Sequence, residues 1–212
     1  MAPAAGEPAR FPADVARPRL VLASQSPARL ATLRAAGLDP EVVVSGVDED
    51  QLTTTDPQEL SVELAKLKAG AVAARVEGAA LVVGCDSVLE LDGEVHGKPG
   101  TAEAATERWR AMRGRSGALH TGHCVVHTGD GRTVSRSART VVHFADIADD
   151  EIAAYVATGE PLAVAGAFTI DGLGGAYVEG IEGDPHTVVG ISLPLLRTML
   201  AELGVPWHTL WR

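Results

Sequence analysis

The stretch Ala79-Ala80-Leu81-Val82-Val83-Gly84-Cys85-Asp86-Ser87-Val88 decides the fold. Its apolar and β-branched first half predicts a buried strand. In an open α/β sheet the carboxyl ends of the strands face the ligand crevice, so we expect Asp86 to emerge there. The alternative is a turn cap, because Asp is common in loops that follow strands. A hairpin turn at Asp92-Gly93 should return the chain to Gly97-Lys98-Pro99 and bring Lys98 near Asp86, a pairing that points to phosphate chemistry.

The segments on either side of this stretch predict a mixed, twisted α/β sheet flanked by helices. Short strands alternate with helices in the first half, and two long alternating segments joined by Gly129-Asp130-Gly131 predict an antiparallel hairpin in the second. We expect strands at residues 20–23, 41–45, 79–83, 118–127, 133–144 and 176–182, and helices at residues 27–37, 57–78, 101–113, 149–158 and 192–203.

The composition is that of an ordinary globular chain. Its 212 residues, 46% hydrophobic and 22% charged, can bury a substantial core. A net charge of −10 argues against binding to nucleic acid or anionic membranes, and no apolar run approaches membrane-spanning length. Residues 1–17 are rich in Ala and Pro and lack the apolar core of a signal peptide. We therefore predict a disordered tail, followed by one folded domain over residues 18–212.

The two cysteines, Cys85 and Cys124, each lie inside an apolar stretch. That usage fits a reducing cytoplasm better than a disulfide scaffold, and we interpret both thiols as buried fillers. A nucleophilic Cys85 is the alternative. A neighbouring carboxylate and an apolar environment would both disfavour its thiolate.

Four clusters stand out by their order and spacing. They are Ala23-Ser24-Gln25-Ser26-Pro27-Ala28-Arg29, Val47-Asp48-Glu49, Gly84-Cys85-Asp86-Ser87-Val88 with Gly97-Lys98-Pro99, and Gly166-Ala167-Phe168-Thr169-Ile170-Asp171-Gly172. Together they resemble the Maf family of nucleoside triphosphate pyrophosphatases, and the resemblance extends over residues 20–203. It implies a two-lobed α/β fold around a deep cleft, similar to that of inosine triphosphate pyrophosphatases. It also implies metal-dependent release of pyrophosphate from a nucleoside triphosphate, house-cleaning of non-standard nucleotides, a role in cell-division arrest, and frequently a homodimer.

The first cluster has the local geometry of a phosphate site. A strand, a tight loop and a helix start present N–H groups to an anion, so Ser24 and the amides around Ser26 can bind phosphate oxygens. Arg29 can add a bidentate guanidinium. Without the resemblance, Ser26 would be interpreted as an N-cap and Arg29 as a solvated helix residue. Lys68 and Lys98 match the family's basic cleft positions, although a solvated helix face remains the alternative for Lys68.

Glu49 and Asp86 are the paired carboxylates of the site. By resemblance Asp86 is the proton acceptor, Lys98 belongs to the same catalytic set, and Glu49 assists a divalent metal ion, Mg or Mn. A carboxylate among cationic side chains keeps a low pKa, which suits a metal ligand better than a strong base. Both roles of Asp86, base and metal ligand, stay open.

Three further positions resemble those that set base preference in the family. Ala28 stands where a second arginine is usual, Ser87 where Thr is usual, and Asp171 where Gln is usual. The chain therefore matches neither the subgroup that hydrolyses thymidine and uridine triphosphates nor the subgroup that prefers 7-methyl-guanosine triphosphate. The preferred base stays open.

Two rival functions remain. One is a non-catalytic nucleotide-binding regulator of septum formation, which would have no need of a water-activating Asp86. The other is an enzyme of the inosine triphosphate pyrophosphatase type, which shares the architecture but has a pocket for purines. An assay of pyrophosphate against orthophosphate over a panel of nucleotides separates them.

Overall fold

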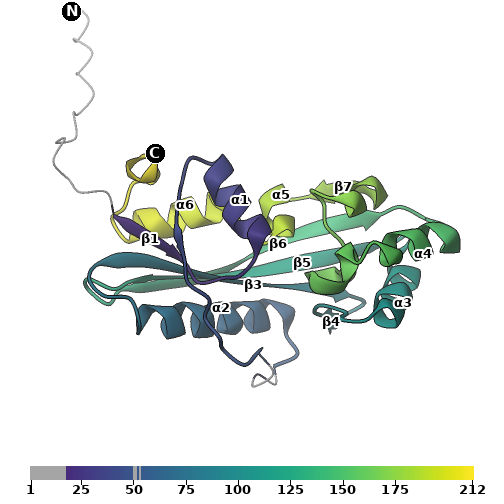
Figure 1. The fold of residues 1–212 in the computed structure, drawn as a ribbon, viewed down its shortest axis with the longest axis horizontal. Coiled ribbons are helices and arrows are strands. Elements are labelled where there is room, and N and C mark those ends of the chain that lie inside the picture. Colours follow the sequence, from purple (N-terminus) through teal and green to yellow (C-terminus); the bar gives the residue numbers. More distant parts are fainter. Residues whose placement is uncertain (1–17, 50–51, 53) are drawn as a thin grey trace, which may run out of the picture.

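The computed structural model describes residues 18–49, 52 and 54–212, and the tail predicted at residues 1–17 lies outside them. The described residues form a seven-stranded mixed sheet with helices on both faces, which confirms the predicted α/β class (Figure 1). The strands are β1 (Arg19–Leu22), β2 (Glu41–Val42), β3 (Ala80–Leu91), β4 (Glu94–His96), β5 (Ser116–His127), β6 (Thr133–Phe144) and β7 (Val178–Glu182). The α-helices are α1 (Pro27–Ala35), α2 (Pro57–Ala73), α3 (Ala102–Met112), α4 (Asp149–Ala157), α5 (Pro185–Val189) and α6 (Leu193–Glu202). Short 3₁₀ segments are η2 (Glu160–Ala163), η3 (Ala165–Ala167), η4 (Leu173–Tyr177) and η5 (Trp207–Leu210).

The strand order is β2-β1-β3-β5-β6-β7, with β4 paired to β3. β1 is parallel to both β2 and β3, whereas β3, β5, β6 and β7 follow one another antiparallel. The predicted long hairpin is therefore confirmed as β5 and β6. Helix α2 covers one face of the sheet, and α1, α5 and α6 cover the other (Figure 1). Helices α3 and α4 lie at the end of the molecule away from β1 (Figure 1). No helix in this part of the chain has the length and apolar composition to cross a membrane.

Side-chain caps explain where the two helices nearest the site begin. The hydroxyl of Ser26 accepts the Arg29 amide at 3.4 Å at the start of α1, and Asp56 accepts the Glu59 amide at 2.7 Å at the start of α2. Each helix has Pro at its first position, where the missing N–H costs nothing. The reciprocal bond of a capping box is not made, because the Glu59 carboxylate accepts the Thr54 hydroxyl instead.

Several element ends differ from the prediction, and the longest difference concerns β3. This strand does not stop at Val83 but continues to Leu91, because β5 pairs with it along almost its whole length. Asp86 therefore lies in the middle of a strand, and its prediction as the residue at a strand's end was wrong. Strand β2 differs in the opposite direction: it was predicted over residues 41–45 and ends at Val42, because its partner β1 ends at Leu22.

Two other element boundaries also differ from the predicted ones. Helix α2 ends at Ala73 rather than at residues 76–78, and Gly78 then adopts a left-handed conformation with φ of 75°. Strand β7 begins at Val178, because residues 173–177 form the 3₁₀ segment η4. The turn at Asp92-Gly93 is confirmed, with φ of 55° and 81° at its two residues.

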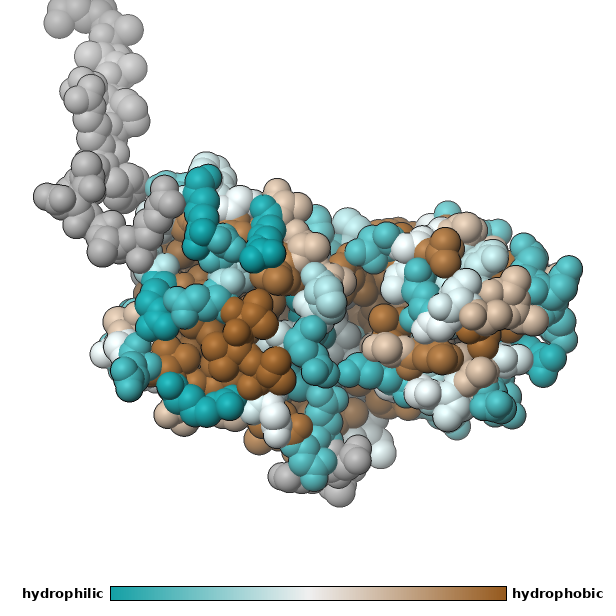
Figure 2. Space-filling view, viewed as in Figure 1, coloured by the Kyte–Doolittle hydropathy of each residue, from teal (hydrophilic) through white to brown (hydrophobic). Residues whose placement is uncertain are grey.

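The two largest of four hydrophobic clusters, called here the two cores, share the long strands of the sheet, and the two smaller clusters lie between the sheet and α2. The core near β1 contains Val83 of β3 with residues of α1 and α6. The core at the other end contains Leu89 of β3 with Trp109 of α3 and residues of α4. Trp109 is fully buried, and its indole N–H donates to the Ala167 carbonyl at 2.8 Å. In the space-filling view a band of hydrophilic residues runs between two regions where apolar side chains reach the surface (Figure 2).

One edge of β3 is open between these two cores. β1 pairs with β3 only as far as Val83, and β4 begins to pair only at Leu89. The five residues Gly84–Val88 in between have no strand partner on this edge among the described residues. The strand that decides the fold thus has an unpaired stretch, Gly84–Val88, at an opening in the sheet.

Candidate active site

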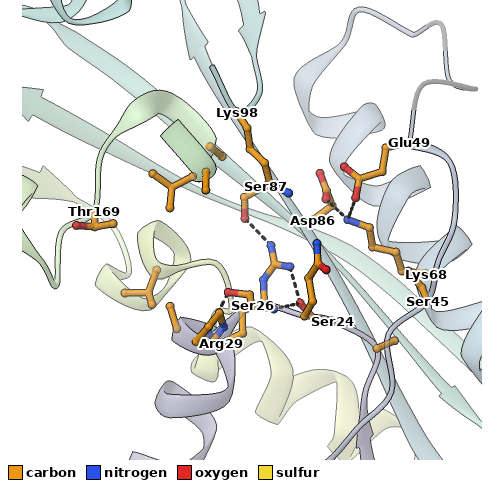
Figure 3. Close-up of a pocket in the computed structure, with 18 of the residues that line it drawn as sticks. Ser24, Ser26, Arg29, Ser45, Glu49, Lys68, Asp86, Ser87, Lys98 and Thr169 are labelled. Carbon is orange, nitrogen blue, oxygen red and sulfur yellow. Dashed lines mark hydrogen bonds and ion pairs between the residues drawn. The ribbon is translucent and has the colours of Figure 1, made fainter. Parts of the chain in front are cut away.

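A cavity of about 520 Å³ lies over the open edge of β3 (Figure 3). Its walls come from the start of α1, the segment after β2, helix α2, β3, the turn after β4 and the segment between η2 and η4. The ten residues predicted for the site all line it: Ser24, Ser26, Ala28, Arg29, Glu49, Lys68, Asp86, Ser87, Lys98 and Asp171. The fold therefore brings together residues that are far apart in the sequence, while their individual roles stay predictions.

Two glycines place helix α2 against the sheet. A Cβ added at Gly84 would lie within 3.0 Å of Ala65 and Ala69, and one added at Gly122 within 3.0 Å of Ser61 and Val62. The helix backbone therefore contacts the strand backbones directly. This close approach sets Lys68, which α2 carries, beside Asp86 of β3.

Lys68 holds the two predicted carboxylates together. Its ammonium lies 2.5 Å from Oδ1 of Asp86 and 2.7 Å from Oε1 of Glu49 (Figure 3). The Lys68 side chain is 8% exposed, so the alternative of a solvated helix face is wrong. Partial burial raises the pKa of Glu49, but the hydrogen bond and charge of Lys68, with Lys98 and Arg29, outweigh it and leave that pKa below its ordinary value. This direction agrees with the low pKa predicted for a carboxylate among cations.

Arg29 is buried, and the protein itself uses most of its hydrogen-bonding capacity. Its Nε donates to the Gly190 carbonyl at 2.7 Å, and its Nη1 donates to Ser24 Oγ at 3.1 Å and to the Cys85 carbonyl at 2.9 Å. Its Nη2 donates to Ser87 Oγ at 3.2 Å. A guanidinium has five N–H groups, so one N–H on Nη2 remains for a ligand. The predicted bidentate clamp therefore does not fit this geometry.

The loop before α1 also differs in detail from the prediction. The Ser26 amide donates to Ser24 Oγ at 3.1 Å and is therefore not free for an anion, whereas the Ser26 hydroxyl accepts the Arg29 amide and keeps its own O–H for a ligand. Ser24 Oγ accepts from both Ser26 and Arg29, which leaves its own O–H to donate into the cavity. Pro27 has no N–H, and the Ala28 amide has no acceptor among the described residues. The hydroxyls of Ser24 and Ser26 and the Ala28 amide are thus the donors that this helix start offers.

A chain of hydroxyl groups fixes the direction of the Ser87 proton. Thr121 donates to the Thr187 carbonyl at 2.8 Å and lies 2.8 Å from Ser87 Oγ. Because Thr121 has one proton, Ser87 must be the donor between them. Ser87 also accepts from Arg29, so it faces the cavity with one remaining acceptor position. Sequence reasoning missed Thr121, whose role depends on a neighbour from another strand.

Lys98 and Asp171 complete the cavity on its more open side. Both are exposed, and Figure 3 shows Lys98 reaching towards Ser87. Asp171 lies in the loop between η3 and η4. That loop is held by Glu160, the first residue of η2. Glu160 accepts hydrogen bonds from Tyr155, Thr169, Leu173 and Gly174 at 2.5–3.1 Å.

Cys85 is a structural residue, as predicted. Burial, against the opposing charge of Arg29, raises the pKa of its thiol to about 12. Cys85 and Cys124 are both buried and unpaired. A thiolate nucleophile at position 85 is therefore excluded at neutral pH.

The donor set suits a divalent ion that arrives with a ligand. Glu49 and Asp86 each give one oxygen to Lys68 and keep the other. Among the residues the structure describes, no group of three or more His, Cys, Asp or Glu side chains could hold a metal ion. Mg²⁺ is commonly held by one or two carboxylates together with substrate phosphates, and this cavity offers that number.

Fold and cavity together define an α/β protein with a cationic, carboxylate-lined pocket on an open strand edge. The chain belongs to the Maf family, because the family model described as Maf-like protein matches residues 19–203. Relatives named nucleoside triphosphate pyrophosphatase are similar in sequence to this chain over nearly its whole length. The Streptomyces coelicolor protein is 62% identical over 92% of this chain and 95% of its own length. The Salinispora tropica protein is 61% identical, over 91% and 87%. The Rhodococcus erythropolis protein is 53% identical, over 92% and 97%.

Solved structures overlap with this chain more weakly. A Mycobacterium abscessus nucleoside-triphosphatase, also titled dITP/XTP pyrophosphatase, has a TM-score of 0.38 and 19% identity over 61% of this chain and 75% of that one. The Staphylococcus aureus Ham1 protein has a TM-score of 0.43 and 18% identity over 60% and 72%. Overlaps of this extent are too small to support an assignment, which rests on the sequence relatives.

Proposed function

We propose that this protein hydrolyses a nucleoside triphosphate between the α and β phosphates, giving the monophosphate and pyrophosphate. The observation that carries the proposal is the arrangement around Lys68, which joins Glu49 and Asp86 on the floor of a cavity that also holds Lys98. The protein as a whole carries a charge of −10, so cations gathered in one cavity serve a local purpose. The names of the relatives support the same reaction.

The chain's own groups divide the work of holding a triphosphate. Ser24 O–H, the Ala28 amide and the Lys98 ammonium can donate to phosphate oxygens, and Arg29 adds one N–H and its charge. Lys68 holds the carboxylates of Glu49 and Asp86 in fixed positions before the ligand binds. Preorganised charges of this kind need no reorganisation during the reaction.

We assign the free oxygens of Glu49 and Asp86 to a divalent ion, Mg or Mn, that enters with the triphosphate. When bound, such an ion neutralises phosphate charge and lowers the pKa of water. Asp86 has two candidate roles, holding this ion or accepting the proton of the attacking water. Its Oδ1 lies 2.5 Å from the Lys68 ammonium and its other oxygen stays available for an ion, which favours the first role.

The test is a product analysis of the purified full chain over five nucleoside triphosphates with Mg or Mn. We expect pyrophosphate and a monophosphate as the first products. Orthophosphate and a diphosphate would contradict the cleavage position. Nucleotide binding without turnover on the whole panel would favour the regulator, and turnover of inosine triphosphate alone would favour the purine-specific rival.

A further inference from the structure

The turn that carries Lys98 is held at both ends by the second core. The Gly97 carbonyl accepts Arg108 Nη1 at 2.8 Å and the Gly166 amide at 3.4 Å. The Gly100 amide donates to the Leu162 carbonyl at 3.0 Å. Lys98 and Pro99 lie between these two fixed glycines, so the direction of the Lys98 side chain depends on bonds made outside the cavity.

Arg108, which donates to the Gly97 carbonyl, is not an ordinary surface arginine. It lies on α3, does not line the cavity, and is only partly exposed. Burial lowers the pKa of its guanidinium from the ordinary value. Two residues further on, Arg110 behaves as surface arginines usually do, because it is exposed and pairs with Asp149 at 2.8 Å. Arg108 instead donates from a partly desolvated guanidinium to the Gly97 carbonyl, which directly precedes Lys98. Partial burial of a charge costs free energy, and this hydrogen bond offsets part of that cost.

We infer that Arg108 is the positioning residue for Lys98: through the Gly97 carbonyl it fixes the turn that aims the Lys98 ammonium into the cavity. The inference rests on the proposed function for its catalytic consequence, and on geometry alone for the placement of Lys98. Arg108 touches neither the cavity nor a ligand, so its effect must pass through Lys98. Displacing a charge by about 1 Å in a reacting site can cost up to about 100-fold in rate.

The kinetic test is a double-mutant cycle. Arg108→Met removes the donor and keeps much of the side chain's length, Arg108→Lys keeps a charge and a donor, and Arg110→Met is the matched control on the same helix. We expect Arg108→Met to lower kcat about 10-fold with a smaller change in KM, Arg108→Lys to recover part of the loss, and Arg110→Met to leave kcat unchanged. In a Lys98→Ala background, Arg108→Met should change kcat less than about twofold. An equal loss in both backgrounds would overturn the inference.

A second measurement does not depend on activity. The chain has three lysines, Lys66, Lys68 and Lys98, so reductive methylation with ¹³C-formaldehyde gives few NMR signals, which single Lys→Arg variants assign. We expect Arg108→Met to shift or broaden the Lys98 signal and to leave the Lys66 signal in place, and Arg110→Met to change neither. An unchanged Lys98 signal in a folded Arg108→Met protein would refute the placement. If wild-type protein released no pyrophosphate, the proposed function would fail while this measurement still decided the placement.

Discussion

The hydrogen bonds of single residues distinguish the groups that hold the site together from the groups that can bind a ligand. Arg29 donates four of its five N–H groups to the protein, and it joins the loop before α1, strand β3 and the turn after α5. Gly190 makes this possible, because a Cβ there would lie 3.0 Å from Arg29 Nε and its φ is 116°. Lys98, by contrast, forms no salt bridge within the described residues, and its side chain lines the cavity. Arg29 therefore acts mainly as a fixed charge.

Replacing Asp86 with Asn should lower kcat by at least about 100-fold, the scale for loss of a positioned base or a metal ligand. Asn has the same shape, so the melting transition should survive. Cys85→Ala is the adjacent control and should keep most of the turnover, because its thiol is protonated at neutral pH. Steady-state kinetics with thermal melts of all three proteins give the answer. Near wild-type turnover in a folded Asp86→Asn protein would show that the site lies elsewhere.

Asp171 should influence which base is preferred. An ionised carboxylate only accepts hydrogen bonds, so it favours bases that present N–H donors, as guanine and cytosine do. We expect the wild type to prefer guanine-type or cytosine triphosphates, and Asp171→Gln to shift relative kcat/KM towards uridine and thymidine triphosphates. One base-edge contact is worth about 1–3 kcal/mol, or about one to two decades in specificity. The ranking of five nucleotides in both proteins measures it, with the exposed Glu179→Gln as a control. An unchanged ranking would mean that Asp171 does not contact the base.

Glu160 should make stability depend on pH at the acid end. Burial raises its pKa, but the hydrogen bonds from Thr169, Leu173, Gly174 and Tyr155 outweigh this and hold the pKa at about 2, against an ordinary 4.5. A depressed pKa means that the ionised group stabilises the fold above pH 4.5 and that this contribution is lost as pH falls towards 2. Glu160→Gln should therefore lower the free energy of unfolding by about 2 kcal/mol at pH 7 and by less at pH 3. Urea titrations at the two pH values measure the difference, and an equal loss at both would contradict the assignment.

At the level of elements, the close contact between α2 and the sheet places Lys68 beside Asp86. Gly84 and Gly122 lie where α2 crosses β3 and β5, and the helix could not approach so closely over any other residue. The approach brings Lys68 to Asp86 at 2.5 Å. The open edge of β3 is the second feature at this scale, since β1 and β4 together leave Gly84–Val88 without a strand partner on that edge among the described residues.

Gly122→Ala should test the first of these features. The new methyl group would meet the Ser61 backbone within 3.0 Å, and overpacking of this kind costs about 1–3 kcal/mol or more. Gly70→Ala is the matched control, because nothing lies within 4 Å of a Cβ at that position of α2. The control should stabilise the protein by about 0.5–1 kcal/mol. Denaturant unfolding compares the variants. Equal stabilities would show that α2 does not lie against the strand backbone.

At the scale of the whole molecule, we expect the two cores and the sheet to form a frame that stays folded without a metal ion. In the part of the chain that the structure describes, no group of three metal-binding side chains occurs. A chelator should therefore leave the melting temperature of the nucleotide-free protein unchanged within about 1 °C, yet abolish pyrophosphate release. Mg²⁺ added with a non-hydrolysable triphosphate should raise the melting temperature, and Mg²⁺ alone should not. Undiminished turnover in excess chelator would contradict the metal role, and unfolding by the chelator would contradict the frame.

The sequence by itself determined the class of fold and the set of residues around the cavity. Local signals were enough for this, because a cap such as Ser26, a turn such as Asp92-Gly93 and an alternating pattern such as that of β5 depend on near neighbours. Resemblance over residues 19–203 to a family then supplied the order of the site motifs. Local signals failed at Asp86, because the length of β3 depends on its pairing with β5, whose residues come some thirty positions later.

Only the tertiary structure decided how the site residues share their hydrogen bonds. The sequence could not show that most N–H groups of Arg29 are already hydrogen-bonded, that Ser87 offers a ligand only an acceptor, or that Lys68 is buried between two carboxylates. It also gave no signal for Arg108, because an arginine on a helix looks the same whether it pairs with Asp149 or holds the Gly97 carbonyl. The physical reason is common to all of these cases. Donors and acceptors are matched across elements that are distant in the chain, and burial, which sets the value of each match, is a property of the assembled fold.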